Sequence, residues 1–137
     1  MKSEEAIGVV FDLEDDGTWF DVEGGGRIKL RIMTPDVNKV IRKKTVKKRV
    51  DFKKVEGVPS RFEYEEVNED LQTELFWDYI IVDWENFIDR NGEQIPCTSE
   101  NKVLLISKST RFVSLLNGFL KELTDYEEEK TAQIEKN

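Results

Sequence analysis

The acidic residues between Asp12 and Glu23 are the pattern in this chain that comes closest to a metal-binding motif. Asp12, Glu14 and Asp16 stand at the first, third and fifth positions of a calcium loop, with Gly17 at the sixth and Glu23 at the twelfth. A calcium loop of this kind needs a helix on each side, whereas here a β-like apolar run precedes it and three glycines follow. We therefore interpret the segment as an acidic hairpin turn, and we expect no metal ion.

Residues that could support catalysis are scarce. The chain has no histidine, which removes the commonest general base and the commonest metal ligand. Its single cysteine, Cys97, follows a proline and is expected to be a partly buried small side chain rather than a nucleophile. The three glycines at 24–26 lack the Lys-Ser or Lys-Thr that completes a phosphate-binding loop. The sequence thus predicts a protein that is not an enzyme, with no catalytic residue and no cofactor.

Basic side chains are concentrated in residues 39–54, which we call the basic block. The block holds one acid, Asp51, and nine basic residues, although the whole chain has a net charge of −8. The nine are Lys39, Arg42, Lys43, Lys44, Lys47, Lys48, Arg49, Lys53 and Lys54. Such a block can pair with the acidic 63–74 segment, with an acidic partner, or with nucleic acid. Because only Phe52 within it could stack on a base, we favour protein contacts over nucleic acid and name Lys43 and Lys47 as candidate partner-binding residues.

The size and composition of the chain suit one domain. Its 137 residues can bury one core, and 10% aromatic residues supply enough bulk to pack it. A lone cysteine excludes an internal disulfide, and neither a signal-peptide run near Met1 nor an apolar run long enough to span a bilayer is present. We expect a protein of a reducing cytoplasm that does not enter the membrane.

The first third of the sequence predicts strands. Residues 27–32 alternate strictly between polar and apolar side chains, which places Ile28, Leu30 and Ile32 on a buried face. Together with strands near 7–11 and 18–22, they predict a three-stranded meander. Thr34 and Pro35 then predict a helix over 35–45. A strand near 48–55 and a partner containing Phe62 and Tyr64 predict a second hairpin.

The remainder of the chain predicts helices. Asn68 caps a helix that the apolar spacing extends to between Trp84 and Phe87. The turn at 89–92 and the Ile-Pro pair at 95–96 then set the angle of the next helix, so Trp84, Gly92 and Pro96 are expected to be structural anchors. A short helix begins at Thr98 or Ser99 and ends near Ile106.

The last helix carries an apolar stripe that reaches Tyr126 and includes Phe112, Leu116, Phe119 and Leu123. We interpret the stripe first as a core face. It is longer than one small core needs, so we also name these four residues as candidate partner-binding residues, with a partner helix or a second copy of the chain as the expected occupant.

These elements predict an α+β fold: a small N-terminal antiparallel sheet with one helix, followed by a C-terminal helical part with a long amphipathic helix. We expect a single domain over 1–137, with a β-rich part at 1–66 and a helical part at 67–129. Residues 130–137 form a polar tail that is expected to fray.

Residues 27–137 resemble a family of bacteriophage proteins, the tail assembly chaperones and related small tail proteins of long-tailed phages and prophages. The resemblance lies in the order of features: the alternating 27–32 strand before Thr34-Pro35, the apolar run ending in Val82-Asp83-Trp84-Glu85, the Asp89–Gly92 turn, Ile95-Pro96, and the helix start at 98–102. It implies a non-enzymatic chaperone that binds the tape measure protein and the tail-tube protein during tail assembly. The alternatives are a structural tail or head–tail joining protein retained in the virion, and a nucleic-acid-binding regulator that uses the basic block.

Overall fold

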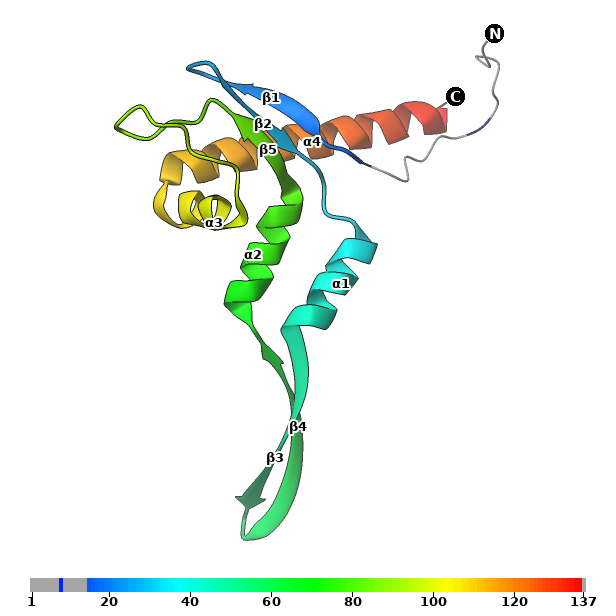
Figure 1. Ribbon diagram of the computed structural model, residues 1–137. Coiled ribbons are helices and arrows are strands. Elements are labelled where there is room, and N and C mark those ends of the chain that lie inside the picture. The colour runs from blue at the N-terminus through cyan, green and yellow to red at the C-terminus, as the bar shows by residue number, and fades with distance from the viewer. Residues whose placement is uncertain (1–7, 9–14, 137) are drawn as a thin grey trace.

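The computed structural model describes residue 8 and residues 15–136, with side chains up to residue 128, as a globular body from which a long β-hairpin projects (Figure 1). The elements are β1 (Thr18–Val22), β2 (Gly26–Leu30), α1 (Pro35–Thr45), β3 (Val46–Val55), β4 (Val58–Val67), α2 (Glu69–Ile80), β5 (Ile81–Glu85), α3 (Ser99–Lys108) and α4 (Thr110–Lys136). This is the predicted α+β class. The backbone of α4 is helical through Lys136, although a polar tail was expected from residue 130.

A three-stranded antiparallel sheet with the order β1-β2-β5 forms the centre of the body. Ile28 is 2% exposed and Leu30 is completely buried, so the predicted buried face of β2 is confirmed, while Ile32 is half-buried beyond the strand's end. The third strand was expected at residues 7–11, nearly all of which lie outside the described residues. Within the described residues the third strand of the sheet is β5, with Ile28 opposite Trp84 and Leu30 opposite Ile81.

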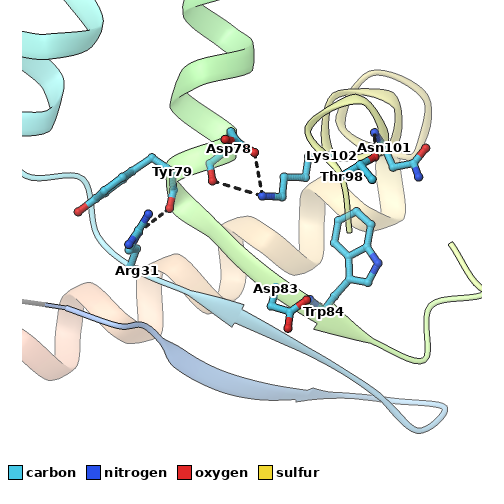
Figure 2. Close-up of polar contacts among 8 residues, drawn as sticks. All are labelled: Arg31, Asp78, Tyr79, Asp83, Trp84, Thr98, Asn101 and Lys102. Carbon is cyan, nitrogen blue, oxygen red and sulfur yellow. Dashed lines mark hydrogen bonds and ion pairs between the residues drawn. The ribbon is translucent and has the colours of Figure 1, made fainter. Parts of the chain in front are cut away.

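The prediction that the second helix continues to Trp84 or Phe87 is wrong. The helix α2 ends at Ile80, and the chain passes directly into β5. β-Branched residues at 80–82 favour a strand, and the Arg31 N–H donates to the carbonyl oxygen of Ile80 at 3.0 Å. The Arg31 Nε donates to the carbonyl oxygen of Tyr79 at 2.6 Å, and its guanidinium lies over the Tyr79 ring (Figure 2). The two hydrogen bonds from Arg31, which directly follows β2, thus hold the point at which α2 ends and β5 begins.

Helix α4 packs against the sheet and completes the core, while α3 packs against α2 and α4. The buried cluster joins the sheet residues Ile28, Leu30, Ile81 and Trp84 to Ile80 of α2 and to Phe112 and Leu116 of α4. A second contact lies further along α4, where the rings of Phe20 and Phe119 stack at 4.7 Å. The apolar stripe of α4 thus covers the sheet along most of its length.

The second predicted hairpin is confirmed and is longer than expected. Strand β3 follows α1 without an intervening residue, β4 reaches α2 through Asn68, and the two strands pair over their full ten residues. Glu56 and Gly57 at the tip both have positive φ, the combination that a two-residue hairpin turn of type I′ requires. All side chains of the two strands are exposed except those of Val46 and Ser60, which are partly buried. We call residues 46–67 the arm (Figure 1).

Thr45 fixes the base of the arm where α1 and α2 come together. Its side chain is 2% exposed and its hydroxyl donates to the carbonyl oxygen of Ile41. The same hydroxyl accepts from the Gln72 Nε2 at 3.2 Å, and the Thr45 carbonyl oxygen accepts from the Asn68 N–H at 2.8 Å. The two strands of the arm therefore leave the body from one hydrogen-bonded junction.

Leu30→Ala is expected to lower the free energy of unfolding by about 2–5 kcal/mol, because it leaves a cavity at the centre of the core. Leu104→Ala is the matched control, since Leu104 is 48% exposed. The control should change stability by no more than about 0.5 kcal/mol. Urea unfolding followed by circular dichroism measures both, and equal losses would contradict this account of the core.

Candidate interaction surface

The apolar stripe of α4 belongs to the core. Phe112 is 7% exposed, Leu116 2% and Leu123 7%, and Phe119 is stacked on Phe20. Of the two interpretations of the stripe, burial supports the core face. Phe112, Leu116 and Leu123 are too buried to reach a partner without opening of the fold, whereas Phe119 is half-buried, so a partner contact of the stripe stays a prediction.

Trp84 anchors the junction that was predicted around it, but the junction joins β5 to α3 rather than two helices. The Trp84 side chain is buried, its Nε1 donates to the carbonyl oxygen of Ile95 at 2.6 Å, and its ring stacks on Phe87. Gly92 has a φ of +79°, which a turn residue with a side chain adopts only with strain. The Pro96 carbonyl oxygen accepts from the Asn101 side chain at 2.9 Å, which ties the connection to the first turn of α3.

A buried lysine, which the sequence did not reveal, holds α3 against α2. Lys102 has only 7% of its side chain exposed, and its ammonium group donates to the Asp78 carboxylate at 3.0 Å and to the Asp78 carbonyl oxygen at 3.3 Å (Figure 2). Pairing with a carboxylate offsets the cost of burying the charge. A lysine in a polar helix start normally predicts a surface position, so only the folded structure shows this contact.

The groups considered for chemistry are dispersed. Asp12 and Glu14 of the calcium-like spacing lie outside the described residues, and residues 18–22 inside it form β1. Among the described residues, no three His, Cys, Asp or Glu side chains are placed to hold a metal ion. Burial raises the pKa of the Cys97 thiol, which lowers its thiolate fraction and its reactivity. The hollows between α1 and α2, about 330 Å³, and beside the β1–β2 turn, about 400 Å³, are open and shallow.

The arm carries the largest group of exposed apolar side chains in the described chain. Phe52 is 69% exposed, the highest value among them. The others on the arm are Val50, Val55, Val58, Phe62, Tyr64 and Val67, which are 39% to 61% exposed. Because exposed apolar groups often mark interaction sites, we take the arm as the candidate binding surface.

The pairing register divides these side chains between the two faces of the arm. Residues directly opposite each other in a hairpin share a face, and successive residues alternate. Val50 and Phe52 of β3 therefore share one face, opposite Glu63 and Arg61 of β4. Phe62 and Tyr64 of β4 lie on the other face, opposite Asp51 and Arg49. Each face thus combines an apolar row from one strand with a charged row from the other.

Positive charge is left unpaired along the arm and at its base. Three ion pairs use arginines: Arg49–Glu66 at 2.6 Å, Arg42–Glu65 at 3.7 Å and Arg61–Glu63 at 2.7 Å. The seven lysines of the basic block, including the candidates Lys43 and Lys47, are exposed, and none forms an ion pair with another described residue. The lysines are therefore available to an acidic partner.

Comparison with known proteins places this arrangement in a family. The model of the YdaY prophage protein family matches residues 27–137. The chain belongs to this family. The match begins within β2 and takes in the whole arm, β5 and all four helices, so the arm is part of the YdaY unit. No curated protein and no solved structure matches the chain.

The family match confirms the phage or prophage part of the resemblance found in the sequence. It carries no information about tail assembly. Within the described part of this YdaY family member, no single helix is long and apolar enough to cross a membrane. The pair formed by α3 and residues 110–128 of α4 meets that length and composition only jointly, with a bend of 106° between the two helices.

Asp78→Ala is expected to lower the free energy of unfolding by about 1–3 kcal/mol, because it leaves the Lys102 ammonium group buried without its carboxylate. Lys102→Met should cost less, since it removes the buried charge and keeps an apolar chain of similar length. Urea unfolding of both single variants and the double variant measures the coupling. Additive losses would show that the pair contributes nothing.

Cys97 should react slowly with iodoacetamide at pH 8, because its raised pKa and its burial reduce the accessible thiolate. The rate is measured by mass spectrometry against a short unstructured peptide with one cysteine. Unfolding the protein in urea should abolish the difference. A folded-state rate faster than that of the peptide would identify an activated thiol and contradict the structural assignment.

Proposed function

We propose that this prophage protein is a non-enzymatic assembly chaperone for a phage tail, acting in the cytoplasm of the bacterial host. Its expected partners are the tape measure protein and the tail-tube protein. The exposed apolar arm is the observation that carries the proposal. The arm offers a partner an extended surface outside the core. The hollows found among the described residues are open to solvent rather than enclosed.

The chemistry of the arm suits temporary cover for an apolar helix. Phe52 with Val50 on one face, and Phe62 with Tyr64 on the other, supply apolar contact area beside charged side chains. Aromatic residues are the usual anchors of protein interfaces. The lysines add contacts to acidic groups on a partner, and the net charge of −8 keeps one complex dispersed from another by repulsion.

This assignment moves the proposed contact surface from α4 to the arm. On α4, Phe112, Leu116 and Leu123 are buried and Phe119 is half-buried against the core, whereas the candidates Lys43 and Lys47 lie on α1 and β3 at the base of the arm. The arm then binds the partner, and α4 stabilises the body that supports the arm.

Two other functions differ from this one in what they predict. A structural tail or head–tail joining protein would be retained in the particle, so mass spectrometry of purified virions should detect it, whereas a chaperone should be absent. A nucleic-acid-binding regulator is favoured by the unpaired lysines. It should bind duplex DNA in a salt-dependent way and lose binding in the Lys43→Glu, Lys47→Glu double variant.

Phe52→Ser is expected to reduce co-purification with the co-expressed tape measure protein of the same prophage by at least about tenfold, the loss typical of removing an interface anchor. Tyr126→Ser is the matched control, because Tyr126 is an exposed aromatic residue on α4, 61% exposed, away from the arm. The control should bind normally, and both variants should keep the melting temperature of the parent. If Phe52→Ser binds as well as the control, or if the parent never co-purifies, the proposed function fails.

A further inference from the structure

Neither long edge of the arm has a neighbouring strand among the described residues, although the Phe52 N–H on the β3 edge donates to the Asp51 carboxylate at 2.9 Å. The arm is a two-stranded sheet, so the outward-facing N–H and C=O groups of β3 and of β4 have no strand to pair with. An isolated two-stranded ribbon is only marginally stable in water, and open edges are ready templates for another strand. Each edge is ten residues long, which is ample for intermolecular pairing.

The two edges have opposite charge. The basic edge comprises the end of α1 and strand β3, with Lys43, Lys44, Lys47, Lys48, Lys53 and Lys54. The acidic edge comprises strand β4 and the start of α2, with Glu63, Glu65, Glu66, Glu69 and Asp70. Neither Glu69 nor Asp70 forms an ion pair with another described residue. The lysines of one edge and the free acids of the other are thus both without partners inside the chain.

This charge pattern selects one way for two copies to meet. Pairing β3 with β3 of a second copy would set lysine against lysine, and pairing β4 with β4 would set glutamate against glutamate. Edge lysines ordinarily prevent strand pairing. Here they oppose pairing between identical edges and favour pairing with an edge of opposite sign, as like charges opposite each other destabilise a sheet.

The strand directions agree with that choice. In the hairpin, β3 and β4 are antiparallel, with Lys47 opposite Glu66 and Lys48 opposite Glu65. If a second copy with the same orientation lies beside the first, its β3 is again antiparallel to the first copy's β4. The same register then repeats between the copies. It also sets the lysines at the end of α1 in one copy beside the acids at the start of α2 in the next.

We propose that copies of this chain associate side by side, with the basic edge of one arm paired to the acidic edge of the next. Because every copy then uses two different edges, the assembly has more than two members and forms a ring if the rotation closes. Strands pair about 4.8 Å apart, whereas helices pack about 8–10 Å apart. The copies must therefore diverge from the arm tips toward the bodies, so a ring has the arms around its axis and the bodies outside. The contact uses the edges of the arm and leaves its faces available, so it does not depend on the proposed function.

Cross-linking between cysteines on different copies tests the pairing directly. Lys48→Cys and Glu65→Cys are prepared separately in a Cys97→Ser background, so that no single chain holds both cysteines. Mixing the two variants under mild oxidation should give disulfide-linked dimers of unlike copies, whereas each variant alone should stay uncross-linked. Dimers formed by either variant alone would show contact between identical edges and overturn the proposal.

Charge exchange provides a second test, which perturbs no ion pair within the chain. Sedimentation velocity of the full chain should show assemblies larger than a dimer. Lys43→Glu with Lys44→Glu, and Glu69→Lys with Asp70→Lys, should each weaken assembly at least tenfold, and an equimolar mixture of the two double variants should restore it. The control is Lys108→Glu with Arg111→Glu, which makes the charge change of the Lys43→Glu, Lys44→Glu variant on the body instead of the arm. It should assemble normally.

A parent chain that stays monomeric at high micromolar concentration overturns the proposal, whether or not its lysines bind duplex DNA. Failure of the mixture to restore assembly also overturns it. Neither result bears on co-purification with the tape measure protein. Loss of that co-purification in a chain that still forms rings would reject only the proposed function.

Discussion

The pairing of β2 with β5 decides the form of this protein. It joins strands that are separated by residues 31–80 and buries Ile28 and Leu30 against Trp84 and Ile81. Residues 31–80 must therefore leave the sheet at the end of β2 and return to it at the start of β5. Helix α1 leads away from the sheet and α2 leads back to it, and the arm lies at the end of this connection farthest from the sheet (Figure 1). The sheet pairing that completes the core therefore also positions the arm outside it.

The body and the arm therefore place their aromatic residues differently. The body uses its aromatic residues internally: Trp84, Phe87 and Phe112 contact one another, and Phe20 stacks on Phe119. The aromatic residues of the arm point outward, and no second layer of described residues covers them. Because the exposed side chains of the arm lie outside the core cluster, they contribute nothing to the packing of the body.

Local signals in the sequence predicted most of the elements but not how they meet. Thr34, Asn68 and Thr98 cap helices as expected, since a cap depends only on neighbouring residues. The strand at Ile81–Glu85 was mistaken for helix, because the apolar spacing from α2 continues through it and its partner strand is distant in sequence. The burial of Lys102 depends in the same way on a distant residue, Asp78 of another helix, so no local pattern indicates it. The arm was predicted as a hairpin, but its isolation from the body is a tertiary property that periodicity does not record.

The junction at Thr45 has a mechanical consequence. Strand β3 follows α1 directly and β4 reaches α2 through Asn68 alone, so no flexible linker separates the arm from the helices. The hydrogen bonds from Asn68 and Gln72 to Thr45 fasten the two sides together where strand becomes helix. The arm and the two helices therefore form one continuous unit, which is joined to the body at the sheet. A force applied at the Glu56–Gly57 tip is therefore transmitted along α1 and α2 to β2 and β5, the two strands whose pairing forms the core.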